Sequence, residues 1–230
     1  MLEQRRTAVV ETPSAIYELL RQRRSSRAFA DRPIPAAVLR SLFAAARWVP
    51  SAGNGQSWAF IVATRDDAEE FARLLGVLTE KKQAWARHAA ALVLAIAPTR
   101  RPDGKEHPLA FYDLGLAVEN LVVEGMAHGV YAHQMSGCDP DAARRVFAIP
   151  EGYAPVVVIA LGYPGNPDDL PEELRARERA PRERKPLPEF VFRARFDQVA
   201  PLVDDAEAAS GPIRRGEWAG GGIVDVPRHQ

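Results

Sequence analysis

The sequence contains one cysteine, Cys138, and this scarcity excludes two kinds of scaffold. A single cysteine cannot form an intrachain disulfide, and without a CxxC pair the chain lacks the usual thiolate ligands of a structural zinc site. Disulfide-free chains are typical of reducing compartments, so we expect a cytoplasmic protein.

Net charge is also lacking, because 30 lysines and arginines balance 30 aspartates and glutamates. This excludes a generally basic surface, and no nucleic-acid partner is expected. Long hydrophobic runs are missing as well, since the longest, near residues 89–97, is too short to cross a bilayer. The first residues lack the apolar core of a secretory signal, so we expect neither export nor a membrane partner.

Several motifs that bind nucleotides or metals are missing. The sequence has no GxGxxG fingerprint, no P-loop, no nucleophile elbow and no HExxH motif. Its five histidines show no ligand spacing, so no metal site is expected. The 230 residues are 47 % hydrophobic and 26 % charged, which is typical of a globular protein with a substantial core.

What the sequence does contain is an alternation of helical and extended patterns. Helices are predicted from residue 13, after Pro35, and at 66–75, 81–87, 111–129 and 140–147. Strands are predicted at 58–64, 90–98, 130–135 and 154–164. The strands are separated by helices but show few parallel β–α–β spacings. We therefore expect an α+β fold in which helices wrap a central sheet.

The predicted helix at 111–129 is apolar on nearly every side and requires burial over most of its surface. In a chain of this length, packing against a second copy would supply that burial. Beyond Gly165 the sequence is dense in mixed charge and contributes little to a core. We divide the chain into a flexible tail at 1–12, one domain at 13–195 and a C-terminal arm at 196–230, which is either disordered or lies across a partner.

Four arginines and two serines lie within seven residues at the predicted end of the first helix: Arg21, Arg23, Arg24, Ser25, Ser26 and Arg27. Guanidinium groups, hydroxyls and backbone N–H groups together suit a phosphate monoester. The alternative is a solvated basic helix end that favours the helix dipole. A later basic cluster, formed by Arg182, Arg184 and Lys185, is either a charged linker or a second clamp on the same phosphate.

Two further features have competing interpretations. The turn-rich stretch PSAGNGQSW at 50–58 lets the backbone approach a flat ligand closely, and the amides of Asn54 and Gln56 can read a heterocycle edge. Its alternative is an ordinary loop between a helix and a strand. Cys138 follows Gly137 at a predicted helix start, so its thiol either has a lowered pKa or is a buried structural group.

Taken in order, these segments resemble the FMN-dependent nitroreductase family over roughly residues 14–192. The resemblance is carried by RRSSRAF at 23–29, PSAGNGQSWAFIVAT at 50–64, the long apolar helix, GVYAHQMSGCD at 129–139, IPEGYAPVVVIALGYP at 149–164 and RERKPLPEFV at 182–191. It implies a mostly antiparallel sheet, an intertwined homodimer with two shared sites, FMN as cofactor, and NADH or NADPH as electron donor.

The resemblance also implies the residues that hold FMN. The segment with Arg23, Arg24, Ser25 and Arg27 would bind the phosphate and, through its last basic residue, approach the N1/O2 side of the ring. A second segment would pack on the flavin from the other subunit, with Pro50, Ser51, Ala52, Asn54 and Gln56. The segment beside flavin N5 would comprise Met135, Ser136 and Gly137. Arg182 and Arg184 match a C-terminal phosphate-binding pair, and Lys82 and Asp113 fall where some members place flavin contacts.

The implied reaction takes hydride from NAD(P)H onto flavin N5 and reduces nitroaromatic, quinone or related small-molecule acceptors by a ping-pong mechanism, without a catalytic side chain. Arg27 or Lys82 would stabilise the reduced flavin. Three departures would adjoin the reaction chamber: Gln56-Ser57-Trp58 replaces the usual Gln-Pro-Trp, Cys138 replaces a phenylalanine, and Ser136 stands where some members have a glutamate. The alternatives are a specialised flavin dehydrogenase, dehalogenase or oxidase, or a non-enzymatic protein that stores or senses flavin.

Overall fold

The computed structural model describes residues 16–203, which fall into two compact units. One unit comprises residues up to Ala180, and the other comprises residues from Pro181 onward. The predicted tail at 1–12 and the arm beyond residue 203 lie outside the described residues. No helix among residues 16–203 is both long and apolar enough to span a bilayer.

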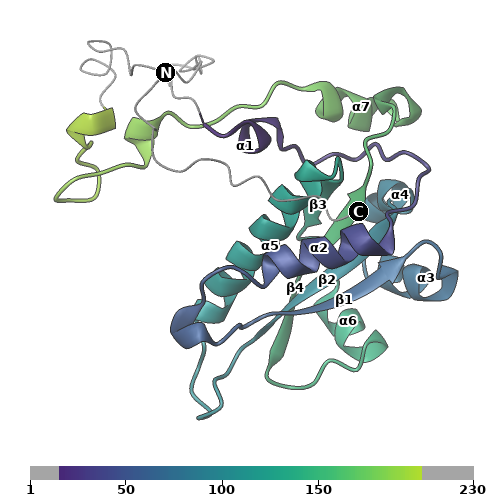
Figure 1. Ribbon diagram of the computed structural model, residues 1–230, viewed down its shortest axis with the longest axis horizontal. Coiled ribbons are helices and arrows are strands. Elements are labelled where there is room, and N and C mark those ends of the chain that lie inside the picture. Colours follow the sequence, from purple (N-terminus) through teal and green to yellow (C-terminus); the bar gives the residue numbers. More distant parts are fainter. Residues whose placement is uncertain (1–15, 204–230) are drawn as a thin grey trace, which may run out of the picture. The chain divides into compact units, whose positions relative to one another are not determined.

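The first unit contains seven α-helices and four strands within its described residues (Figure 1). The helices are α1 (Glu18–Gln22), α2 (Ala36–Ala46), α3 (Ala68–Gly76), α4 (Glu80–Ala86), α5 (Leu109–Ala127), α6 (Pro140–Val146) and α7 (Glu172–Arg179). The strands are β1 (Ala59–Thr64), β2 (Ala91–Pro98), β3 (Tyr131–Met135) and β4 (Tyr153–Gly162). All four strands and most of the helices coincide closely with the predicted ones.

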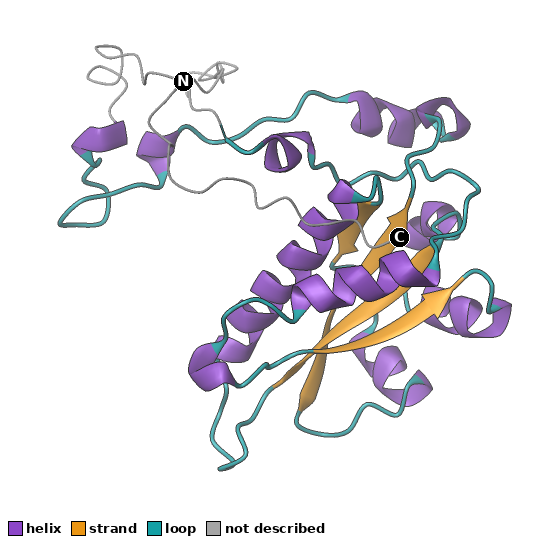
Figure 2. Ribbon diagram, viewed as in Figure 1, coloured by secondary structure: helices purple, strands orange, loops and turns teal. Residues whose placement is uncertain are grey.

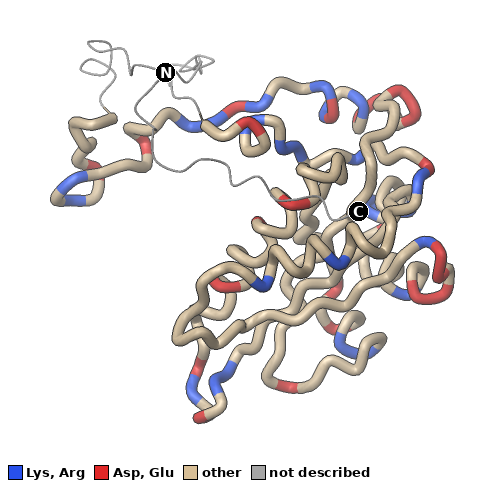
Figure 3. The backbone as a smooth tube through the Cα atoms, viewed as in Figure 1, with Lys and Arg blue, Asp and Glu red and all other residues tan. Residues whose placement is uncertain are grey.

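The four strands form one antiparallel sheet in the order β1-β2-β4-β3, so β1 and β3 are its two edges. None of the four strands carries a charged residue, as the uncoloured tube in Figure 3 shows. The central strand β2 is buried on both faces along almost its whole length. The sheet and its helical cover confirm the α+β fold expected from the sequence.

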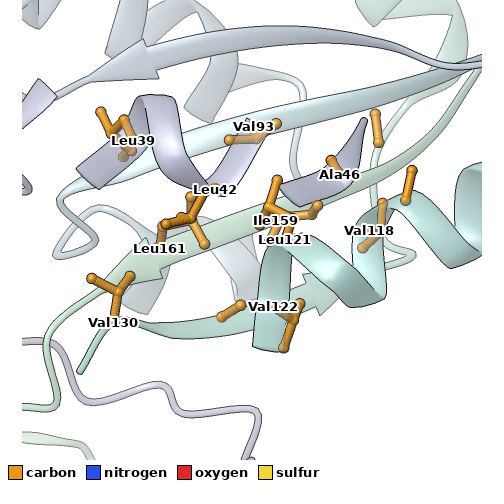
Figure 4. Close-up of a cluster of buried hydrophobic side chains, with 14 of the residues drawn as sticks. Leu39, Leu42, Ala46, Val93, Val118, Leu121, Val122, Val130, Ile159 and Leu161 are labelled. Carbon is orange, nitrogen blue, oxygen red and sulfur yellow. The ribbon is translucent and has the colours of Figure 1, made fainter. Parts of the chain in front are cut away.

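Alternate residues of β2 face two separate cores. Val93 and Ala95 pack with α2 and α5, whereas Leu92 and Leu94 pack with α3, α4 and α6. Figure 4 shows part of the first core, which includes Leu42 of α2 and Leu121 of α5, and Figure 2 shows the helices on both sides of the strands. The two-residue period of a strand thus divides the helices between the two faces.

Two helices differ from their predicted form. Helix α1 is only five residues long and begins at Glu18, so the apolar spacing that starts near residue 13 overstates its length. Helix α5 begins at Leu109, and a single stripe of its surface is buried against the sheet and α2. Phe111 and Tyr112 remain 47 % and 65 % exposed. Within one chain, α5 is therefore buried along one stripe only, and its expected burial against a second copy stays a prediction.

The arginine-rich segment continues into a stretch that is fixed beside the end of β4. Phe29 forms a β-bridge with Pro164, and the backbone N–H of Ala30 donates to the Tyr163 carbonyl at 2.9 Å. A Cβ at Gly165 would lie 2.5 Å from the Phe29 carbonyl carbon, so only glycine allows this close approach. The segment after α1 is therefore held beside the end of the sheet at Phe29 and Ala30.

Candidate functional site

One set of predicted site residues lies at the edge strand β3. Buried His133 on this strand directs its Nδ1 at the Ser26 carbonyl, 3.1 Å away, and because a carbonyl only accepts, the ring donates. The side chain of Lys82 from α4 passes over Gly137, where an added Cβ would lie 3.4 Å from Lys82 Cε. We call residues 23–27, Lys82 and 135–137 the basic half-site.

The basic half-site has a positive electrostatic field. Burial and the charges of Arg27 and Lys82 together lower the pKa of His133 to about 4, although its hydrogen bond to the Ser26 backbone opposes the change. His133 is therefore neutral at physiological pH. Two cations acting on one buried ring converge on the same region, which fits an anionic group such as a phosphate or a reduced flavin.

Within this half-site, Arg23 and Ser25, which are predicted to bind a phosphate, contact each other. The Arg23 guanidinium donates to the Ser25 hydroxyl at 3.3 Å, and Ser25 is exposed. Ser136 is exposed too, but the Met135 side chain is only 1 % exposed and belongs to the core beneath α4 and α6. The strand alternation leaves only the backbone of Met135 available to a ligand.

Glu178 of α7 is a member of this region that the sequence reasoning missed. Its carboxylate accepts from the Ser26 hydroxyl and, at 3.0 Å, from the Arg27 backbone N–H. The Arg27 guanidinium lies 3.7 Å from the same carboxylate. Arg24 donates to the carbonyl of Glu178 and, at 3.3 Å, to that of Ala180, so it holds the end of α7.

A second set of predicted residues lies in the loop 50–56, before β1. Asp113 of α5 is 1 % exposed, and both of its carboxylate oxygens lie 3.3 Å from the Ala52 backbone nitrogen, which donates. The Gln56 backbone N–H donates to the Ser51 hydroxyl at 3.0 Å. We call residues 50–56 with Asp113 the loop half-site.

The loop half-site presents backbone rather than charge. Residues 52–56 are exposed. Asn54 and Gln56 have φ values of 56° and 49°, in the left-handed region that non-glycine residues seldom occupy. Strained backbone of this kind persists only where its surroundings hold it. An exposed and fixed backbone of this kind suits a flat ligand.

Ser57 and His107 form a contact that the sequence reasoning did not foresee. The Ser57 hydroxyl lies 2.9 Å from His107 Nε2, and Ser57 is buried. This pair ties the loop before α5 to the end of the loop half-site. Ser57 is also where the sequence departs from Gln-Pro-Trp, so the departure adds a hydrogen bond that proline cannot make.

The two half-sites lie at opposite edges of the sheet. Ala59, which begins β1, pairs with Ile96 of β2, while His133 on β3 pairs with Ala160 of β4. Crossing from β1 to β3 takes three strand spacings, or about 14 Å. Ile96 pairs in turn with Pro155, so the two positions are also offset along β4 by five residues, or about 17 Å.

They also lie on opposite faces, because Asp113 comes from α5 and Lys82 from α4. A single chain therefore does not bring the two half-sites together. Arg182 and Arg184 belong to the second unit, and their part in the site stays a prediction.

Cys138 is half-buried, and burial raises the pKa of its thiol above the usual value. The hypothesis of a lowered pKa is therefore wrong, because desolvation outweighs any benefit from the following helix start. Residues 16–203 contain no group of three or more histidine, cysteine, aspartate or glutamate side chains that could hold a metal ion.

Comparison with known proteins gives concordant results. The sequence model of the Nitroreductase family matches residues 20–163. A 15.4 kDa protein of Mycolicibacterium smegmatis is 31 % identical over 153 residues, which cover 65 % of this chain and 97 % of that protein. A provisionally named NADH dehydrogenase/NAD(P)H nitroreductase of Archaeoglobus fulgidus is 29 % identical over 162 residues, 67 % of this chain and 88 % of the relative.

Solved structures share the fold. A crystal structure described as an oxidoreductase containing FMN has a TM-score of 0.76 and 31 % identity, and the alignment covers 80 % of this chain and 94 % of that one. A nitroreductase family protein of Clostridium difficile has a TM-score of 0.59 and 24 % identity, over 76 % of this chain and 95 % of that one, which supports the fold alone.

Proposed function

The chain belongs to the nitroreductase family, and from this premise we propose that it is an FMN-dependent oxidoreductase acting as a homodimer with shared sites. The observation that carries the proposal is the diagonal separation of two half-sites on one sheet. The basic half-site suits the anionic parts of a nucleotide, and the loop half-site suits its flat ring. A second copy, turned by a two-fold axis, would supply the half that each chain lacks.

In the basic half-site, Arg23 and Ser25 would hold the FMN phosphate by charge-assisted hydrogen bonds. Arg27 and Lys82 would lie along the N1/O2 side of the ring, where their charges favour an anion. Arg182 and Arg184 would add a second pair of cations to the phosphate. The name of the solved relative, an oxidoreductase containing FMN, supports FMN as the cofactor.

The partner would supply the loop half-site. The exposed backbone of 52–56, anchored by Asp113, would cover the ring from the other side. The exposed part of α5 favours such an interface, because Leu109 and Phe111 are each 47 % exposed and Tyr112 is 65 % exposed. Single monomers rarely leave neighbouring large apolar side chains in water without a partner.

When bound, FMN supplies the redox chemistry, taking hydride from NADH or NADPH at N5 and passing electrons to a nitroaromatic, quinone or related acceptor by a ping-pong sequence. The chain's own residues bind and orient the cofactor, and none is required as a catalytic acid or base. The provisional NADH dehydrogenase/NAD(P)H nitroreductase name of the archaeal relative supports the choice of donor.

The test is reconstitution of the purified protein with FMN, followed by desalting, a visible absorbance spectrum and steady-state assays. We expect a yellow protein that oxidises NADH or NADPH with menadione or nitrofurazone as acceptor. Bound flavin without turnover would favour a specialised flavin enzyme or a storage protein. A colourless protein that cannot be reconstituted would contradict the proposal.

The phosphate assignment has its own test. Arg23→Ala should weaken FMN binding by about 1.5–3 kcal/mol, which corresponds to about 10- to 150-fold. Arg40→Ala, an exposed arginine on α2, is the matched control and should bind FMN as the wild type does. An Arg23→Ala protein that stays fully yellow after desalting would show that the phosphate lies elsewhere.

A further inference from the structure

Glu178 lies beyond the family match, which ends at residue 163, yet it contacts Arg27 of the basic half-site. The side chains of Glu178 and Arg27 are 10 % and 21 % exposed. The two residues are 151 positions apart in the sequence. Their pairing therefore joins the arginine-rich segment to α7, which comes much later in the sequence.

The position of Glu178 is fixed from two sides. Ser26 and the Arg27 backbone N–H both donate to its carboxylate, and Arg24 donates to its carbonyl. Farther along α7, the Arg179 guanidinium donates to Asp168 at 2.7 Å, which ties the helix to the turn before it. A carboxylate held by this many contacts has little freedom to leave the guanidinium.

The effect of this pairing on charge follows from its burial. In a partly buried site, charges a few ångströms apart interact more strongly than in water. Burial lowers the pKa of Arg27, and the charge of Glu178 opposes that change. Arg27 stays protonated, since arginine keeps its charge in proteins. Any group beside Arg27 therefore experiences a guanidinium that is partly offset by a carboxylate.

We propose that Glu178 is a positioning residue that holds Arg27 against the cofactor and offsets part of its charge, so that bound FMN is harder to reduce than beside an unpaired arginine. The inference rests on the proposed function. Reduction of FMN takes up two electrons and one proton and leaves one additional negative charge on the ring. A positive field stabilises the negatively charged reduced flavin. Glu178 weakens the field of Arg27 and therefore disfavours reduction.

The experiment compares the midpoint potential of FMN bound to wild type, Glu178→Gln, Glu178→Asp and Glu172→Gln, by equilibration with a reference dye. Glu178→Gln keeps the shape but removes the charge. In Glu178→Gln we expect the ratio of reduced to oxidised FMN at a given potential to be about tenfold higher than in wild type. This corresponds to a positive shift of the midpoint potential by about 30 mV for a two-electron couple. Glu178→Asp, with a shorter side chain, should fall between the two.

Glu172→Gln is the matched control, because it removes the same charge from an exposed position on the same helix. Its potential should equal that of wild type. A Glu178→Gln potential that is unchanged or more negative would overturn the proposal, as would an equal shift in Glu172→Gln. If Glu178→Gln does not fold, the direction of the Glu178→Asp shift decides the question.

Failure of this inference is distinguishable from failure of the proposed function. Wild-type protein that binds no FMN would contradict both. Wild-type protein that binds FMN and turns over, with potentials insensitive to residue 178, would contradict only the role given to Glu178. Thermal unfolding of each variant shows whether a shift reflects lost structure, because a merely structural role would lower the melting temperature without moving the potential.

Discussion

The basic half-site and the loop half-site are built in opposite ways. The first contains several charged groups, and its residues Ser26 and Arg27 are held by His133 and Glu178 from two other parts of the chain. The second is a short loop of exposed backbone that is hydrogen-bonded to one buried carboxylate, that of Asp113. The basic half-site therefore provides positive charge, and the loop half-site provides an exposed backbone surface.

This difference explains why neither half is sufficient. A positive field binds an anion but does not fix a flat ring, and an exposed backbone contacts a ring but does not hold a phosphate. Because they lie on opposite edges and faces of the sheet, the two halves can be altered separately. The following variants use this separation, beginning with the change that affects both halves.

The largest effect is expected at the core that holds both halves in place. Leu121 of α5 is fully buried over the sheet, as Figure 4 shows. Leu121→Ala should lower the free energy of unfolding by about 2–5 kcal/mol, because it leaves a cavity. Urea unfolding measures this, and both half-sites should be lost in one transition. A loss below about 1 kcal/mol would mean that the site can collapse around the smaller side chain.

The next prediction affects the basic half-site alone and concerns pH. His133 has a folded pKa of about 4 and an unfolded reference value of 6.5. Between these values the unfolded chain binds more protons, so the free energy of unfolding should fall as pH drops from 6.5 towards 4. The loss at pH 4 is roughly 3 kcal/mol.

Above pH 6.5 this contribution is fully present. His133→Asn keeps a donor for the Ser26 carbonyl but does not titrate in this window, so its stability should change less with pH. The measurement is urea unfolding of both proteins at several pH values. If the free energy of unfolding depends on pH in the same way in wild type and His133→Asn, the lowered pKa of His133 is not its cause.

A third change affects the loop half-site alone. Asp113→Ala removes the carboxylate that accepts the Ala52 N–H. It should cost about 1.5–3 kcal/mol, the range for a hydrogen bond to a charged group. The loop at 50–56 should also become more sensitive to limited proteolysis. An unchanged cleavage rate would show that the loop keeps its conformation without the Asp113 carboxylate.

The smallest effect is expected at Ser57. Ser57→Ala removes its hydrogen bond to His107 and should lower the free energy of unfolding by about 1 kcal/mol. Asp67→Ala, at the N-cap of α3 far from either half-site, is a control of similar size. FMN affinity should fall in Ser57→Ala and not in Asp67→Ala. Equal FMN affinity in both variants would show that the Ser57 hydroxyl does not hold the loop at 50–56 in its FMN-binding conformation.

The fold was predictable because its signals are local. The uncharged apolar runs of the strands, the proline before α2 and the capping Asp67 before α3 each act within a few residues. The arginine cluster and the loop at 50–56 were identified from their residue types, whereas Lys82, Asp113 and residues 135–137 were added only by resemblance. Asp113, for example, lies on a helix whose pattern is otherwise apolar.

Other parts depend on contacts that distant segments make. Glu178 stands among many charged residues, and nothing local distinguishes the one that reaches Arg27. His133 looked like one histidine among five, and its role follows from the strand that places it beside Ser26. The direction of the Cys138 pKa likewise required knowledge of its burial.

The central claim is that each FMN site combines the basic half-site of one chain with the loop half-site of another. Co-expression of differently tagged Arg23→Ala and Asp113→Ala chains tests it most directly. Each variant alone should retain little FMN after desalting. In the mixed dimer, one site would carry both changes and the other neither, so we predict about one tightly bound FMN per dimer. A mixed dimer that binds no more FMN than either parent would contradict the account.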